Sequence, residues 1–68
     1  MDYESIKSYE GTSVKLTLLN DFWYRAKIIK VTETTVTFIE QKGRTVCVRP
    51  EDIAMALPMN TEVSSYNG

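Results

Sequence analysis

An alternation of β-branched and aromatic residues runs through the middle of this chain and limits the folds it can adopt. Residues 22–31, 36–40 and 45–49 are rich in Val, Ile, Thr and aromatic residues, which pack well on a pleated, half-buried surface. The three- to four-residue apolar spacing of an amphipathic helix is missing from these segments. Turn residues separate them at 32–35 and 41–44. The stretch therefore predicts two consecutive β-hairpins and an all-β fold.

The second of these strands is predicted to bend. The side chains expected to face inward are Phe22, Tyr24, Ala26 and Ile28, followed by Ile29 and Val31. Two consecutive isoleucines at this change of phase predict a β-bulge, the device that lets a strand curl around a small barrel. In the following hairpin, the inward positions are expected at Val36, Phe38, Val46 and Val48.

Two outer strands complete a predicted five-stranded sheet. Residues 14–19 form the first strand and end at the turn residues Asn20 and Asp21. Residues 53–57 form the last strand, in which alternation places Ala54 and Ala56 outward. This strand carries no charge, and an uncharged exposed edge is normally blunted or paired. We therefore expect its edge to pair with another strand.

Two short helical segments are also predicted. Residues 2–10 form about two turns of helix, in which Tyr3, Ile6 and Tyr9 share the face that covers an open end of the barrel. Pro50 interrupts the ladder before the last strand and predicts a single 3₁₀ turn. Trp23 faces away from the core, either as a surface aromatic for a partner or packed under the helix, and packing is the favoured placement.

The length allows one domain, which we place at residues 1–58, followed by a polar tail at 59–68 that is expected to be mobile. A domain of this size buries only roughly 60% of its unfolded surface, so it needs additional stabilisation. Cys47 is the only cysteine and histidine is absent, which excludes an internal disulfide and makes a zinc site untenable. No metal or other cofactor is expected. A compact barrel, self-association or both must supply the stability.

Charge is unevenly distributed along the chain. The net charge is −1, yet residues 14–49 hold seven basic against three acidic side chains, while both flanking segments are acidic. A basic body with acidic ends permits a polyanionic partner, although solvated strand faces explain the same charges equally well.

Several functional classes are disfavoured. The chain shows no signal peptide and no apolar run near ~18 residues, so no membrane association is expected and a cytoplasmic location is the default. It lacks histidine, a glycine-rich phosphate loop and a nucleophile beside a base, so we do not expect an enzyme. Cys47 is interpreted as a small filler residue.

Residues 14–58 resemble the Sm-like family, including its bacterial Hfq branch. Residues 16–28, LTLLNDFWYRAKI, are similar to the first two strands of that family, with Ala26 at its usual glycine. Residues 46–58, VCVRPEDIAMALP, are similar to its second motif, in which a hydrophobic strand, a basic pair and an isoleucine strand follow one another. Pro50 departs from that motif, because it stands where glycine or histidine is expected.

The resemblance implies a small, strongly bent five-stranded Sm-like (SH3-like) barrel with a short amino-terminal helix. In this family the fourth strand of one subunit pairs with the fifth of the next, closing a ring of six or seven copies that binds single-stranded RNA near its pore. The family's positions for base stacking, base reading and basic support fall on Thr35 (or Thr34, if the register slips by one residue), Thr37 and Arg49. Thr35 is not aromatic, so the stacking contribution of ~1–3 kcal/mol per base is missing.

A second reading comes from a different functional class. The last strand also looks like that of the RimP carboxyl-terminal domain, an SH3-like barrel. The chain is then a protein-interaction or ribosome-associated module without RNA binding at a pore, and Trp23, Tyr24 and Tyr66 are its candidate peptide contacts. A monomeric mass distinguishes this module from a ring.

Overall fold

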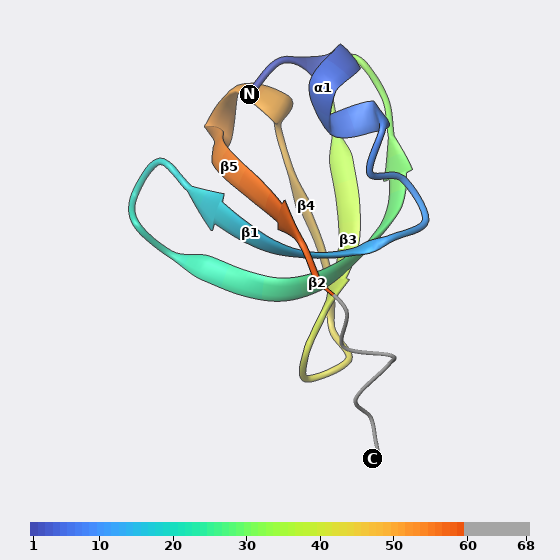
Figure 1. Cartoon of the computed structure of the whole chain (residues 1–68), viewed down its shortest axis with the longest axis vertical. Coiled ribbons are helices and arrows are strands. Elements are labelled where there is room, and N and C mark those ends of the chain that lie inside the picture. Colours follow the sequence, from blue (N-terminus) through green and yellow to red (C-terminus); the bar gives the residue numbers. More distant parts are fainter. Residues whose placement is uncertain (60–68) are drawn as a thin grey trace.

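A computed structural model of the chain describes residues 1–59 and is shown in Figure 1. Its elements are α1 (Tyr3–Lys7), β1 (Ser13–Leu18), β2 (Trp23–Val31), β3 (Val36–Glu40), β4 (Thr45–Val48), the 3₁₀ helix η1 (Pro50–Asp52) and β5 (Ile53–Pro58). Within these residues no helix has the length and apolar character needed to cross a membrane. The prediction of a mobile tail lies, apart from Met59, outside the described residues.

All five strands belong to one antiparallel sheet, which confirms the all-β class. The strand order is β4-β3-β2-β1-β5, and every neighbouring pair is antiparallel. The sheet is open, because β4 and β5 lie at its two ends and are not paired with each other within residues 1–59. Figure 1 shows β1 and β2 crossing the molecule below α1, with the β3–β4 turn extending further down.

The predicted bulge lies in the middle of β2. The pairing of β2 with β3 shifts between Ile28 and Lys30, which leaves Ile29 as the extra residue. Ile28 and Val31 are buried, but Ile29 is 44% exposed. The bulge is therefore confirmed, and the inward placement of Ile29 is wrong because the unpaired residue of the bulge turns to the surface.

Two aromatic residues at the start of β2 differ from expectation. Phe22 lies in the β1–β2 turn, before the strand begins, and is 62% exposed. Asp21 adopts a positive φ of 72°, and Leu18 N donates to Phe22 O at 2.7 Å, so the turn closes on Phe22. Trp23 is 51% exposed, and Lys15 Nζ lies 5.0 Å from its ring centroid. Packing of Trp23 under the helix is wrong.

The phase of β5 also differs from simple alternation. Its pairing with β1 shifts between Thr17 and Leu18, so that Thr17 faces Met55 and Leu18 faces Ile53. The shift leaves Ala54 without a β1 partner and turns Ala56 inward, where it is 5% exposed. The outward placement of Ala56 is therefore wrong, and Met55 becomes a surface residue.

The core fills the concave side of the sheet, and α1 covers it. Its fully buried side chains are Ile6, Val14, Leu16, Ile28, Val31, Val36, Phe38 and Ile53. Tyr3 and Tyr9 pack against this cluster with Ile6, as their spacing predicts. The helix itself is shorter than the predicted residues 2–10, because it ends at Lys7 and continues as turns.

Several hydrogen bonds connect the end of this segment to β2. Gly11 has a φ of +85°, and its N–H donates to Ile28 O at 2.7 Å. One carboxylate oxygen of Glu10 accepts from Val31 N at 2.8 Å. This hydrogen bond, aided by the nearby Lys7 ammonium, lowers the pKa of Glu10. These bonds attach the segment that follows α1 to β2 at Ile28 and Val31.

Glu40 is the one buried acidic residue within residues 1–59, and the β3–β4 turn supplies hydrogen-bond donors to its carboxylate. Lys42 N donates to Glu40 Oε1, and the Arg44 guanidinium donates to Oε2 at 2.9 and 3.2 Å. Burial alone would raise the pKa of Glu40, but these hydrogen bonds and the charge of Arg44 outweigh burial and lower it. The sequence analysis did not identify this residue.

The lowered pKa of Glu40 predicts an acid-sensitive hairpin. Because the pKa is lower in the folded than in the unfolded chain, ionised Glu40 contributes stability above the ordinary carboxyl pKa of about 4. That contribution is lost as the pH falls through the lowered folded value. We expect Glu40→Gln to flatten the fall of melting temperature with acidification, measured by circular dichroism. An unchanged slope would show that Glu40 contributes little to acid sensitivity.

Candidate nucleic-acid interface

The three predicted site residues come from two segments that the β3–β4 pairing brings together. Thr35 immediately precedes β3, Thr37 lies within it, and Arg49 follows β4 as the cap of η1. Val36 pairs with Val48, so the residues flanking this pair, Thr35 and Arg49, are neighbours across the two strands. Both residues line a shallow depression of about 270 Å³.

Thr37 lies beside this depression rather than in it. It pairs with Cys47 across β3 and β4, and its hydroxyl lies 3.5 Å from Cys47 Sγ. Cys47 in turn lines the depression with Val48 and Asp52. The structure therefore places all three predicted residues in one region, with Cys47 connecting Thr37 to the other two.

The Arg49 guanidinium is exposed and engaged by its own chain. Its Nε lies 3.4 Å from Asp52 Oδ2, and one terminal nitrogen lies 3.8 Å from Glu51 Oε2. The Arg49 side chain is 67% exposed, and ion pairs of this kind contribute about 0–1 kcal/mol because water and salt screen them. These ion pairs therefore hold the guanidinium only weakly.

Threonine hydroxyls provide the remaining polar chemistry. The loop before β3 is held by Thr32, which donates from its backbone N–H to Thr35 O at 2.8 Å and accepts from Thr35 N at its hydroxyl. Among residues 1–59, the Thr35 hydroxyl hydrogen-bonds only to the neighbouring Thr34 hydroxyl, at 3.4 Å. It is therefore available to an external donor or acceptor.

The depression can bind an anion and read a polar edge, but it offers no stacking surface. Its described lining consists of Thr35, Cys47, Val48, Arg49 and Asp52, none of which is aromatic. Residues 1–59 also hold no cluster of three or more potential metal-binding His, Cys, Asp or Glu side chains. Contact with a nucleic acid at this place would consist of hydrogen bonds and charge.

Sequence reasoning missed Asp52 and Cys47 as members of this region. Cys47 could have been found from its outward phase in β4, because it alternates with the inward Val46 and Val48. Asp52 could not, because its approach to Arg49 depends on the turn of η1, in which Asp52 N donates to Arg49 O at 2.9 Å.

A second depression adjoins this region beside the β1–β2 turn. It has a volume of about 300 Å³ and is lined by Leu18, Leu19, Asn20, Val48 and Asp52. Val48 and Asp52 line both depressions. We call the first depression, together with Thr37, the Arg49 region. It lies beside the edge strand β4, because Arg49 directly follows that strand.

Comparison with known proteins does not assign a role to this region. A functional assignment therefore depends on the chemistry of Thr35, Thr37 and Arg49 and on the open edges of the sheet. No family model, no curated protein and no solved structure matches the chain.

Proposed function

We propose that this chain is an Sm-like protein that assembles into a homo-oligomeric ring of six or seven copies and binds single-stranded RNA near the pore. The observation that carries the proposal is the strand order β4-β3-β2-β1-β5, with η1 between the two edge strands. This order supports the resemblance of residues 14–58 to that family. In the ring, each bent sheet forms a small Sm-like barrel.

The two sheet edges provide the means of assembly. Within residues 1–59, β4 pairs only with β3 and β5 only with β1, so each strand presents a row of backbone donors and acceptors on its other side. No residue of β5 is charged, and Met55 and Leu57 are about half exposed. Pairing of β4 with β5 of the next copy satisfies both edges and repeats around a closed circle.

The position of Arg49 supports RNA as the ligand. It follows β4 directly, so assembly through this edge repeats its guanidinium once per subunit. A circle of such cations attracts a phosphate backbone. The Thr35 and Thr37 hydroxyls supply hydrogen bonds to base edges, whereas the missing aromatic residue predicts weaker binding than a stacking site gives.

Light scattering tests the assembly. A ring has six or seven times the 7.8 kDa mass of the chain, and we expect this mass at micromolar concentration. A monomeric mass would instead favour an SH3-like interaction module. The half-exposed Trp23 is compatible with that alternative. Tyr24 is not well placed as a contact, because it packs on Phe38 with ring centroids 5.3 Å apart. Tyr66 lies outside the described residues.

Fluorescence anisotropy with oligouridylate at ~50 mM salt tests the RNA site. Arg49→Ala is expected to weaken binding uniformly and to reduce the salt dependence by about one unit of slope, as loss of a phosphate contact does. Thr37→Val should weaken binding while leaving the salt slope unchanged. Lys42→Ala is the matched control, because Lys42 lies in the β3–β4 turn. An assembled ring without measurable affinity at ~50 mM salt would exclude the RNA role.

A further inference from the structure

The outward surface of β2, β1 and β5 combines cations with apolar side chains. We name it the outer patch, and its members are Lys15, Trp23, Arg25, Lys27, Met55 and Leu57, all of them exposed. The strand registers place them in adjoining rows: Lys15 pairs with both Arg25 and Leu57, and Thr17 pairs with both Trp23 and Met55. The patch is therefore continuous across three strands.

This surface points away from α1. The residues that alternate with the outer patch, such as Val14 and Ala26, are buried in the same cluster as Ile6 of the helix. Successive side chains of a strand point to opposite faces, so the outer patch lies on the far side of the sheet. It is also distinct from the Arg49 region, which β3, β4 and η1 form.

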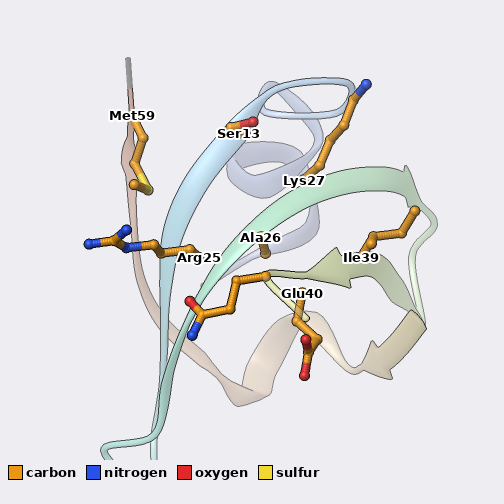
Figure 2. A pocket seen from close by; sticks show the side chains of 8 residues that line it. Ser13, Arg25, Ala26, Lys27, Ile39, Glu40 and Met59 are labelled. Carbon is orange, nitrogen blue, oxygen red and sulfur yellow. The ribbon is translucent and has the colours of Figure 1, made fainter. Parts of the chain in front are cut away.

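The cations of the outer patch have no internal counter-charge within residues 1–59. β1, β2 and β5 contain no acidic residue, and Lys15 lies directly opposite Arg25, an arrangement that destabilises a sheet. Arg25 and Lys27 line a depression of about 380 Å³ that also includes Glu40. Figure 2 shows the Glu40 carboxylate directed away from both cations, and Arg44 holds it instead.

An unneutralised like-charge pair beside exposed apolar side chains fits an acidic ligand with apolar groups. We propose that the outer patch docks an acidic polypeptide segment of a partner protein, whose carboxylates meet Lys15, Arg25 and Lys27 and whose apolar side chains contact Trp23, Met55 and Leu57. Neither the ring nor the RNA site is needed for this interaction.

Two features favour a polypeptide over a nucleic acid on this surface. The Lys15 ammonium already occupies one face of the Trp23 ring, at 5.0 Å from its centroid, where a base would stack. The other apolar members, Met55 and Leu57, are aliphatic and about half exposed, and such side chains gain most from contact with aliphatic or aromatic side chains of a partner.

Trp23 provides a direct test, because it is the only tryptophan of the chain. The probe is the synthetic peptide acetyl-Glu-Leu-Glu-Phe-Glu-Leu-Glu-amide, which has no tryptophan. We expect a saturable change in Trp23 emission as peptide is added. The affinity obtained from this titration should fall about tenfold between about 50 and 500 mM salt. A peptide with Lys in place of Glu should not bind, and one with Ser in place of Leu and Phe should bind more weakly.

Arg25→Glu is the decisive variant. It leaves Lys15 and Trp23 in the chain, and it places a carboxylate opposite Lys15. We expect peptide affinity to fall about tenfold or more while the melting temperature rises, because the cross-strand repulsion becomes an attraction. Lys42→Glu makes the same charge change in the β3–β4 turn and should alter neither quantity appreciably.

Three results would overturn the proposal. The first is no change in Trp23 emission with the acidic peptide at low salt. The second is an equal loss of affinity in Arg25→Glu and Lys42→Glu, which would assign binding to overall charge. The third is stronger binding of oligouridylate than of the peptide, abolished by Arg25→Glu but not by Arg49→Ala, which would assign the surface to nucleic acid.

Discussion

Replacing Phe38 with alanine is expected to leave much of the protein unfolded at room temperature. Phe38 is fully buried, and its ring centroid lies 5.3 Å from the ring centroid of Tyr24. Truncation of a buried phenylalanine costs about 3–5 kcal/mol, because apolar contacts are lost and a cavity remains. A chain of 68 residues has roughly 3–10 kcal/mol of stability in total. Urea unfolding followed by circular dichroism at fixed protein concentration measures the loss.

The neighbouring residue supplies the control for this experiment. Ile39 is 39% exposed on the opposite face of β3, so Ile39→Ala truncates a large apolar side chain of the same strand without opening the core. We expect it to cost below about 1 kcal/mol. Equal losses for Phe38→Ala and Ile39→Ala would show that the concave side of the sheet is not the principal core.

If the chain assembles into the proposed ring, Ala54→Pro is expected to reduce the mass in solution from that of the ring to that of a single chain. Proline removes a backbone N–H from β5 and is poorly tolerated inside a continuous sheet. The folded chain itself should accept the change. Ala54 has no β1 partner, and the preceding Ile53 has φ −96° and ψ 122°, which suit a residue before proline. Light scattering measures the mass, and circular dichroism confirms the fold.

Ala54→Ser is the matched control, because it retains the N–H group at the same exposed position. Its mass should equal that of the unmodified ring. A folded Ala54→Pro variant with the full mass would show that pairing along the β5 edge is not what joins the subunits. A reduced mass in both variants would implicate the alanine methyl group instead of the backbone.

Much of the architecture follows from local patterns. The β-branched runs predict the strands, Asp21 and Gly43 adopt the positive φ expected in turns, and the Ile28-Ile29 pair marks the bulge. The errors arise where two strands must adapt to each other. The β1 sequence alternates regularly, so nothing in it indicates the shift at Thr17 that turns Ala56 inward. Such a shift depends on pairing between distant segments.

The candidate site shows the same division. The family resemblance predicts Thr35, Thr37 and Arg49 as site residues, and the β3–β4 pairing brings these three residues into one region. Alternation correctly placed Cys47 on the outward side, but its contact with Thr37 depends on strand register. Alternation placed Trp23 away from the core, but whether the helix covers it there depends on tertiary packing, and Trp23 is exposed.

The buried carboxylate of Glu40 has a consequence for the free edge of β4. Its bonds to Lys42 and Arg44 close the turn in one alignment only, and slipping the hairpin by one residue would separate Glu40 from both partners. A slip would also exchange the backbone groups that β4 directs outward, because these alternate along a strand. The hairpin turn therefore determines the sequence of amide donors and carbonyl acceptors that an approaching strand must match.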